Sequence, residues 1–147
     1  MNESIESQRM AVFVGGALFS AEGKLLLLCR ADNSEWELPG GPLDFGEAPE
    51  LGLMRGFMDG TDIDISVDRP LGAWSIVERV NGDKVAQHSI HIDWTVRTAG
   101  VLTGVDLDKE RYSSFAWLSR DEALARVILP APKDSIGRAF SALARSR

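Results

Sequence analysis

The chain has 147 residues, the length of one domain with a substantial hydrophobic core. Its 44% hydrophobic and 26% charged residues are typical of a soluble globular protein. Its net charge of −6 argues against sequence-independent binding to nucleic acid or to an anionic membrane, because both depend on basic surface. We therefore expect a single domain over residues 1–147, with the polar residues 1–8 as a frayed tail.

The compartment is predicted from what the sequence lacks. Cys29 is the single cysteine, so an internal disulfide cannot form and a reducing environment is favoured. The first residues carry Glu3 and Glu6 instead of the positive segment of a signal peptide. No stretch reaches the roughly 18 apolar residues of a membrane span. These features predict a cytoplasmic protein in which Cys29, within an apolar run, is buried and inert.

The first half of the chain predicts two strands and a helix. Residues 10–19 read as a strand in which Gly15 and Gly16 mark a bulge or a close backbone approach. A turn at 20–23 leads to residues 24–30, whose four leucines suit a central strand buried on both faces.

Trp36 then leads into Pro39-Gly40-Gly41, where a strand stops and the chain turns. An acidic loop follows, and Pro49 suits the first position of a helix. The helical spacing of the apolar residues predicts a buried stripe. Its members are Leu51, Met54 and Met58, widened by Leu53 and Phe57.

The second half of the chain predicts mainly strands and two helices. Residues 63–67 alternate as an edge strand that Arg69-Pro70 should break. Residues 71–80 and 84–98 read as a hairpin joined by a tight type I′ turn at Asn81-Gly82.

A strand at 115–118 then precedes a capping box, with Ser119 as the cap and Glu122 at the third helical position. The last helix, at 133–145, should bury one apolar face. That face comprises Ile136, Phe140 and Leu143.

The two histidines lie on the second hairpin strand. His88 and His91 are three residues apart, so they point to opposite faces and cannot hold one metal together. Each is either a packed or solvated residue or a functional one. His91 with Asp93, on one strand face, is the better functional pair.

The stretch from Gly41 to Ile63 resembles the box of the Nudix hydrolases, G-x5-E-x7-R-E-U-x-E-E-x-G-U, where U is a bulky aliphatic residue. The positions that match in register are Gly41, Glu47, Arg55, Phe57 in a bulky slot, and Ile63. The family's three metal-binding glutamates are replaced by Gly56, Asp59 and Gly60, and its later glycine by Asp62. The segment Trp117 to Glu122 also resembles the tail of many Nudix domains.

The resemblance implies an α/β fold, a Nudix-type α/β/α sandwich with a mixed sheet. It also implies a weak Mg²⁺ or Mn²⁺ site made by the Gly40 carbonyl, Glu47 and Asp59, with phosphates of the ligand completing the shell. Catalytic candidates are Asp59, Glu47, Arg55 and Glu110. Substrate-binding candidates are Arg30, Trp36, Gly41, His91 and Asp93.

Several candidates have a plain structural alternative. Arg30 either faces phosphates or ends a solvated strand, and Trp36 either stacks on a ligand or packs in the core. Glu110 either assists the site or belongs to a solvated acidic loop. Arg55 and Asp59 alternatively form a surface ion pair. We expect the pocket at the Gly40-Gly41 turn, between the box helix and the strand that carries His91 and Asp93.

Gly52, Gly56 and Gly60 repeat every four residues and give one helix face without side chains, at about 1 kcal/mol each relative to alanine. Adjacent backbone or a ligand can approach such a face closely, or the glycines reflect drift after loss of catalysis. Restoring glutamate at positions 56, 59 and 60 should then rebuild the metal ligands and recover helix propensity.

Three functions stay open. The first is a weak metal-dependent hydrolase of a nucleoside diphosphate linked to another group. The second is a non-catalytic sensor that binds a nucleotide or another small phosphorylated ligand. The third is a protein-interaction domain whose glycine face contacts a partner or a second copy, as in a homodimer.

Overall fold

The computed structural model describes residues 10–146, so the expected tail at 1–8 lies outside the described residues. The helices and strands follow one another along the chain as β1 (Ala11–Ala17), β2 (Leu25–Arg30), β3 (Trp36–Glu37), β4 (Gly40–Pro42), α2 (Pro49–Thr61), β5 (Ile65–Val80), β6 (Lys84–Thr98), β7 (Tyr112–Leu118), α3 (Arg120–Arg126) and α4 (Pro130–Ser146).

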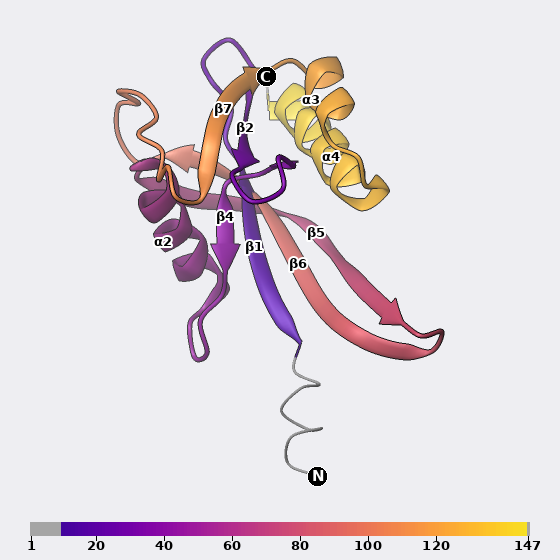
Figure 1. Cartoon of the computed structure of the whole chain (residues 1–147). Helices are drawn as coiled ribbons and strands as arrows, with labels where there is room; N and C mark the ends of the chain where they lie inside the picture. Colours follow the sequence, from indigo (N-terminus) through magenta and orange to yellow (C-terminus); the bar gives the residue numbers. More distant parts are fainter. Residues whose placement is uncertain (1–9, 147) are drawn as a thin grey trace.

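The strands form two sheets (Figure 1). The larger sheet has the order β4-β1-β6-β5 and is mixed, because β1 pairs parallel to β6 while the other pairs are antiparallel. The smaller sheet, β3-β2-β7, is antiparallel with β2 in the centre. The α/β fold with a mixed sheet is confirmed, and the second sheet adds to the prediction.

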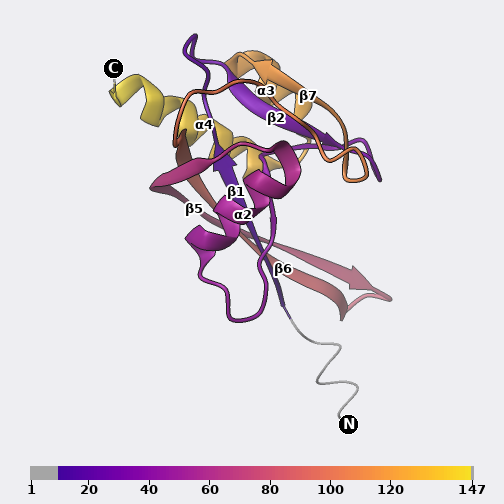
Figure 2. The same cartoon turned by 90° about the vertical axis from the view of Figure 1, so that its left-hand side faces the viewer.

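The leucines of β2 show how the helices cover both sides of the sheets. Leu26 and Leu28 join a cluster that includes residues of α2, whereas Leu25 and Leu27 join another that includes residues of α3 and α4. Because successive residues of a strand point to opposite faces, α2 lies on one side and α3 and α4 on the other (Figures 1 and 2). The prediction of a central strand buried on both faces is confirmed, as is the burial of Cys29.

The chain passes from the small sheet to the large one at Pro39. β3 ends at Glu37, and β4 begins at Gly40, which pairs with Gly15 of β1. Gly40 has a φ of 157°, and a Cβ there would collide with the Val14 carbonyl. Position 40 therefore requires glycine. The prediction that a strand stops at Pro39 is confirmed.

The predicted buried stripe of α2 is wrong in part. Leu51, Met54 and Met58 are exposed by 61%, 36% and 42%, whereas Leu53 and Phe57 are fully buried. The inward face is completed by Gly52, Gly56 and Gly60, all buried. Glycines allow the helix to approach its neighbours closely, so this face turns inward and the longer apolar side chains remain outside.

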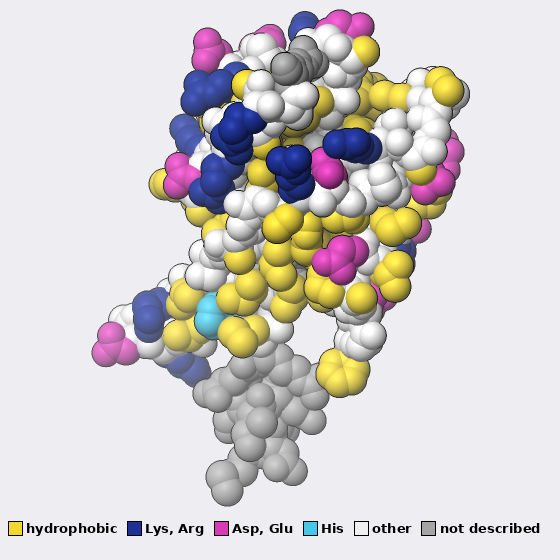
Figure 3. All heavy atoms as spheres, turned by 180° about the vertical axis from the view of Figure 1, so that it is seen from behind, with side chains coloured by type: hydrophobic (Ala, Val, Ile, Leu, Met, Phe, Trp, Pro, Cys, Tyr) yellow, Lys and Arg dark blue, Asp and Glu magenta, His cyan; other side chains and the backbone are white. Residues whose placement is uncertain are grey.

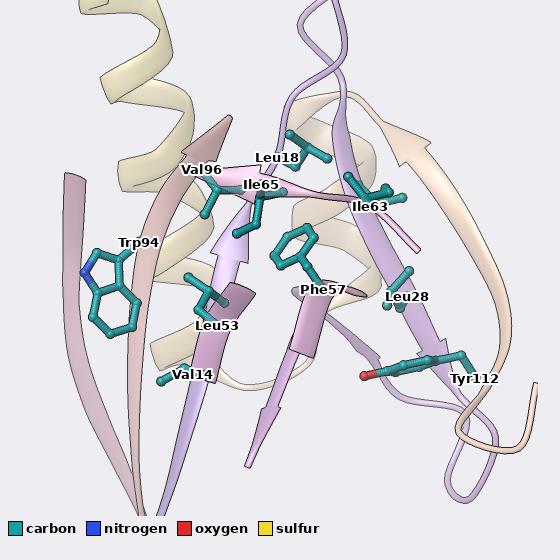
Figure 4. Packing of buried hydrophobic residues seen from close by; sticks show 11 residues of the cluster. Val14, Leu18, Leu28, Leu53, Phe57, Ile63, Ile65, Trp94, Val96 and Tyr112 are labelled. Carbon is teal, nitrogen blue, oxygen red and sulfur yellow. The ribbon is translucent and has the colours of Figure 1, made fainter. Parts of the chain in front are cut away.

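Phe57 lies at the centre of the α2-side core (Figure 4). Its ring is surrounded by Leu18, Ile63 and Ile65, and one edge of its ring is near Gly16 of β1. A Cβ on Gly16 would lie 2.7 Å from Phe57 Cε2, so a larger residue there would displace the ring. Gly15 and Gly16 thus mark a close approach of side chains to β1.

The second half of the chain differs from prediction at two places, the predicted strand break at Arg69-Pro70 and the hairpin connection. β5 continues through Arg69 and Pro70, because register shifts between Val67 and Arg69 and between Pro70 and Gly72 accommodate the proline. The hairpin connection comprises three residues, 81–83, instead of a two-residue turn, although Asn81 and Gly82 both have positive φ.

The C-terminal predictions are confirmed with small changes in bounds, except that Leu143 is half-buried and lies outside the core cluster. The Ser119–Glu122 capping box is formed in both directions. α4 begins earlier than predicted, at Pro130, and Ile136 and Phe140 pack in the core cluster on this side.

Figure 3 shows the molecule from behind, with Lys and Arg side chains gathered over its upper part and hydrophobic side chains below them. Within residues 10–146, no helix is both long enough and apolar enough to cross a membrane.

The packing of α2 on β4 gives a stability prediction for Gly56→Ala. A Cβ at this position would lie 2.8 Å from the carbonyl carbon and oxygen of Gly40, which are backbone atoms with little freedom to move. We expect a loss of about 1–3 kcal/mol in the free energy of unfolding, despite the higher helix propensity of alanine.

Gly137→Ala in α4 is the matched control, because nothing beyond its own stretch of helix backbone lies within 4 Å of the added Cβ. It should gain up to about 1 kcal/mol. Chemical denaturation of the three proteins measures both changes, and a Gly56→Ala variant as stable as Gly137→Ala would contradict the close packing.

Candidate functional site

Glu47 and Arg55 tie the acidic loop to α2. Arg55 donates through Nε to Glu47 Oε2 at 2.8 Å and through Nη2 to Oε1 at 2.9 Å, a two-point ion pair. Glu47 Oε1 also accepts from the backbone N–H of Asp44 at 3.0 Å. These bonds, that of Arg55 first, lower the pKa of Glu47 to about 2. Both Glu47 oxygens are therefore already engaged within the chain.

Arg55 also pairs with Asp59, the one carboxylate at the three positions where the Nudix box has metal-binding glutamates. Its Nη1 lies 3.5 Å from Asp59 Oδ2, the i,i+4 pair predicted as the plain alternative. Its Nη2 donates to the Pro42 carbonyl at 3.0 Å. The Glu47 bonds, and more weakly the nearby Asp44 and Asp59, raise the pKa of Arg55. Arg55 thus links the acidic loop to α2 and forms ion pairs with both Glu47 and Asp59.

The glycine face of α2 packs inside its own chain. Gly56 lies against the Gly40 backbone, and a Cβ on Gly60 would lie 3.2 Å from the Tyr112 ring. The proposed partner surface on this face is therefore wrong, because its residues are buried. A glutamate at position 56 would also require α2 or β4 to move, because Gly56 lies against the Gly40 backbone. The prediction that glutamates at positions 56, 59 and 60 simply rebuild the metal ligands is therefore corrected.

The residues present do not fit a divalent cation of the kind that the resemblance implies. Within residues 10–146, no three His, Cys, Asp or Glu side chains come together as a metal-binding group. Glu47 and Asp59 are paired with Arg55, and the Gly40 carbonyl accepts a hydrogen bond from Arg111.

Arg111 is the side chain at the Gly40 carbonyl. It precedes β7, and its Nη2 lies 3.3 Å both from the Gly40 oxygen and from the Tyr112 hydroxyl. A Cβ on Gly41 would lie 3.0 Å from Nη2, and one on Gly60 would lie 4.0 Å from Nη1. The guanidinium therefore lies between β4 and the C-terminal end of α2.

Arg30 at the end of β2, Asp32 in the turn that follows and Glu37 of β3 form a polar cluster whose Glu37 feels the charge of Arg111. Arg30 bonds Asp32 at 2.6 and 2.9 Å, and its Nε lies 3.6 Å from Glu37 Oε1. Burial raises the pKa of Glu37 to about 7, although Arg30 and Arg111 oppose the shift. The Glu37 side chain remains 36% exposed, so solvent screening limits the free energy involved.

Trp36 and Glu110 lie apart from this cluster. Trp36 packs with the cluster on the side of α3 and α4, and the Arg126 guanidinium lies 4.6 Å from the centre of its ring. Glu110 is exposed, and its backbone N–H donates to Asp108 Oδ1. The structure therefore gives Trp36 the packing role and leaves Glu110 without a side-chain contact to the box.

His91 and Asp93 project from the sheet face opposite α2. His91 stacks between Trp74, 3.9 Å away, and Phe13, 5.0 Å away, and burial lowers its pKa. Asp93 is buried, accepts from Trp74 Nε1 at 2.9 Å and has its pKa raised by burial, with Ser135 of α4 as a further partner.

The predicted pocket between α2 and these two side chains is therefore wrong. Asp93 is buried against Trp74 and against Ser135 and Arg138 of α4, while the half-buried His91 is stacked on both sides by aromatic rings. The neighbouring residues Trp94 and Val96 of β6 point to the α2 side, so the sheet separates His91 and Asp93 from α2. The clearest hollows of residues 10–146 lie instead beside Asp62 and the loop at 98–106.

Sequence reasoning missed Arg111, Tyr112 and Glu37. Arg111 and Gly40 are 71 residues apart, so no local spacing joins them. The one available signal is that a polar loop ends in Arg-Tyr directly before a strand, which anchors the arginine close to the sheet end.

The Glu37 carboxyl gives a prediction for the pH dependence of stability. Its folded pKa, about 7, lies above its ordinary value of 4.5, so the folded state binds a proton that the unfolded state has lost between these values. This group therefore makes the free energy of unfolding fall as pH rises from about 4.5 to 7.

Glu37→Gln should remove this dependence, so it should stabilise the protein more at pH 8 than at pH 5. Urea denaturation at both pH values measures the difference, and Glu35→Gln controls for the loss of one negative charge. A Glu37→Gln effect that is the same at both pH values would count against the raised pKa.

Comparison with known proteins identifies the family to which this fold belongs. The model of the NUDIX domain matches residues 9–142. A MutT-like protein of Streptomyces ambofaciens is 31% identical over 117 residues, which cover 80% of this chain and 69% of that protein.

Solved structures similar in fold include a NUDIX hydrolase from Nitrosomonas europaea, with a TM-score of 0.73, 17% identity and coverage of 91% of this chain and 90% of that one. An Ap4A hydrolase of C. elegans, solved as a binary complex, has a TM-score of 0.71, 15% identity and coverage of 94% and 98%. The match over nearly the whole chain shows that this protein belongs to the Nudix family.

Proposed function

We propose that this Nudix-family protein binds a small phosphorylated ligand, of the nucleoside diphosphate class, without hydrolysing it by a metal-dependent route. The observation that carries the proposal is the contact of Gly56 with the Gly40 carbonyl. At the place where the family box supplies a carboxylate beside this carbonyl, the chain has no side chain and no room for one.

The chemistry of diphosphate hydrolysis explains why this contact matters. The charge of a diphosphate repels an incoming hydroxide, so a hard cation among several oxygen ligands must neutralise it and lower the pKa of water. Here Glu47 and Asp59 pair with Arg55, whose charge compensates theirs. The loss of ligands and the internal pairing together favour binding over turnover.

The ligand class is supported by the family. The C. elegans relative is named as an Ap4A hydrolase, so its fold accommodates a nucleotide with a phosphate chain. Arg111 supplies positive charge beside the Gly40 carbonyl in a chain that is acidic as a whole, whereas Arg30 is already paired with Asp32. A phosphate group is the part of such a ligand that Arg111 suits best.

The weak hydrolase is the alternative that one observation favours. The Asp59 side chain is 55% exposed, so a Mg²⁺ or Mn²⁺ ion from solvent can reach it. Such an ion would need Glu47 to leave Arg55, so any turnover would be slow. The two functions differ in their dependence on metal and on Asp59.

A thermal-shift screen with turnover assays distinguishes them. We expect some nucleoside diphosphate derivative to raise the melting temperature in EDTA, because a ligand of the folded state stabilises it by mass action. Mg²⁺ or Mn²⁺ should add little, no phosphate or nucleotide product should appear, and Asp59→Asn should leave the ligand shift unchanged. Metal-dependent product formation that Asp59→Asn abolishes would establish the hydrolase instead.

A further inference from the structure

We infer that the Arg111 guanidinium takes the place of a divalent cation beside the Gly40 carbonyl and is the group that binds a phosphate of the ligand. This inference rests on the proposed function and assigns its phosphate-recognition residue. A carbonyl oxygen that would ligate a metal instead accepts a hydrogen bond from a fixed organic cation, 3.3 Å away.

The backbone of Arg111 is anchored on both sides. Its N–H donates to the Asp108 carbonyl at 3.1 Å, and its carbonyl accepts from the Ala31 N–H at 2.9 Å. The loop itself is joined to α2, because the Asp108 N–H donates to the Gly60 carbonyl at 2.9 Å. The guanidinium is thus placed by the same helix end that lacks the family glutamate.

The side chain keeps donors available for an anion. Nη2 contacts the Gly40 oxygen and the Tyr112 hydroxyl, while Nε and Nη1 have no acceptor among residues 10–146. In the same part of the chain, no carboxylate oxygen lies within 4.0 Å of Arg111, the limit for an ion pair. Five N–H groups and a permanent charge make arginine a good partner for phosphate oxygens.

Two neighbouring positions carry no side chain. Gly41 and Gly60 border the guanidinium, and a Cβ at Gly41 would lie 3.0 Å from Nη2. A glutamate at position 60 would pair with Arg111 and neutralise it. Gly60 therefore leaves Arg111 as a half-buried cation whose natural counter-ion is a ligand phosphate. The raised pKa of Glu37 also reduces competition from this nearby carboxyl, because more of it is protonated near neutral pH.

Titration calorimetry in EDTA with inorganic pyrophosphate and with ADP tests this assignment. Arg111→Gln should bind both probes about 10-fold or more weakly than the wild type, because it loses a charge-assisted hydrogen bond. Arg120→Gln, on the exposed first turn of α3, removes an equal charge and should bind within about 2-fold of wild type. Arg111→Lys should retain part of the affinity.

The outcomes separate this inference from the proposed function. Wild-type affinity in a folded Arg111→Gln variant would overturn the role of Arg111 and leave metal-free binding intact. Binding of the probes by the wild type only when Mg²⁺ is present, or no binding at all, would overturn both. If Arg111→Gln does not fold, the Nε–H resonance of Arg111 in the wild type decides: it should shift on addition of pyrophosphate, and an unchanged resonance would refute the assignment.

Discussion

The contact between α2 and β4, made by Gly56 on the Gly40 backbone, determines the arrangement of everything near the box. A helix can approach a neighbouring backbone this closely only where it carries no side chain, and three glycines at intervals of four provide such a face. Leu53 and Phe57 lie beside that face and enter the core, while Leu51, Met54 and Met58 stay outside. The glycines that lower helix propensity are therefore a condition of the packing.

The same contact explains the distribution of charge. With no glutamates on the inward turns, Arg55 binds the remaining carboxylates, Glu47 and Asp59, and serves to join loop and helix. A second arginine, Arg111, then reaches the Gly40 carbonyl from across the molecule. The positive charge at this carbonyl thus comes from the chain itself, in a geometry set by β7 and the end of α2.

Local signals in the sequence were sufficient for most of the fold. Pro39, Pro49, the leucines of β2 and the Ser119 capping box act through backbone geometry or short-range periodicity, and each prediction based on them is confirmed. The buried face of α2 was misjudged because counting apolar side chains ignores the packing value of glycine. The pocket was misplaced because the face of β6 that carries His91 and Asp93 packs against other parts of the chain, which strand alternation alone does not show. Arg111 was missed because its contact with Gly40 is purely tertiary.

We infer that α2 and β4 do not hold a divalent cation at the Gly40 carbonyl, because Arg55 and Arg111 already engage the groups that would bind it. Amide spectra of the ¹⁵N-labelled protein, recorded with increasing Mn²⁺, test this inference because the paramagnetic ion broadens signals from nearby nuclei. We expect the signals of Gly40, Gly41 and Gly60 to broaden no more than those beside exposed carboxylates such as Asp121, which lies on α3. Selective broadening of the Gly40, Gly41 and Gly60 signals at low Mn²⁺ would show instead that a cation binds beside the Gly40 carbonyl.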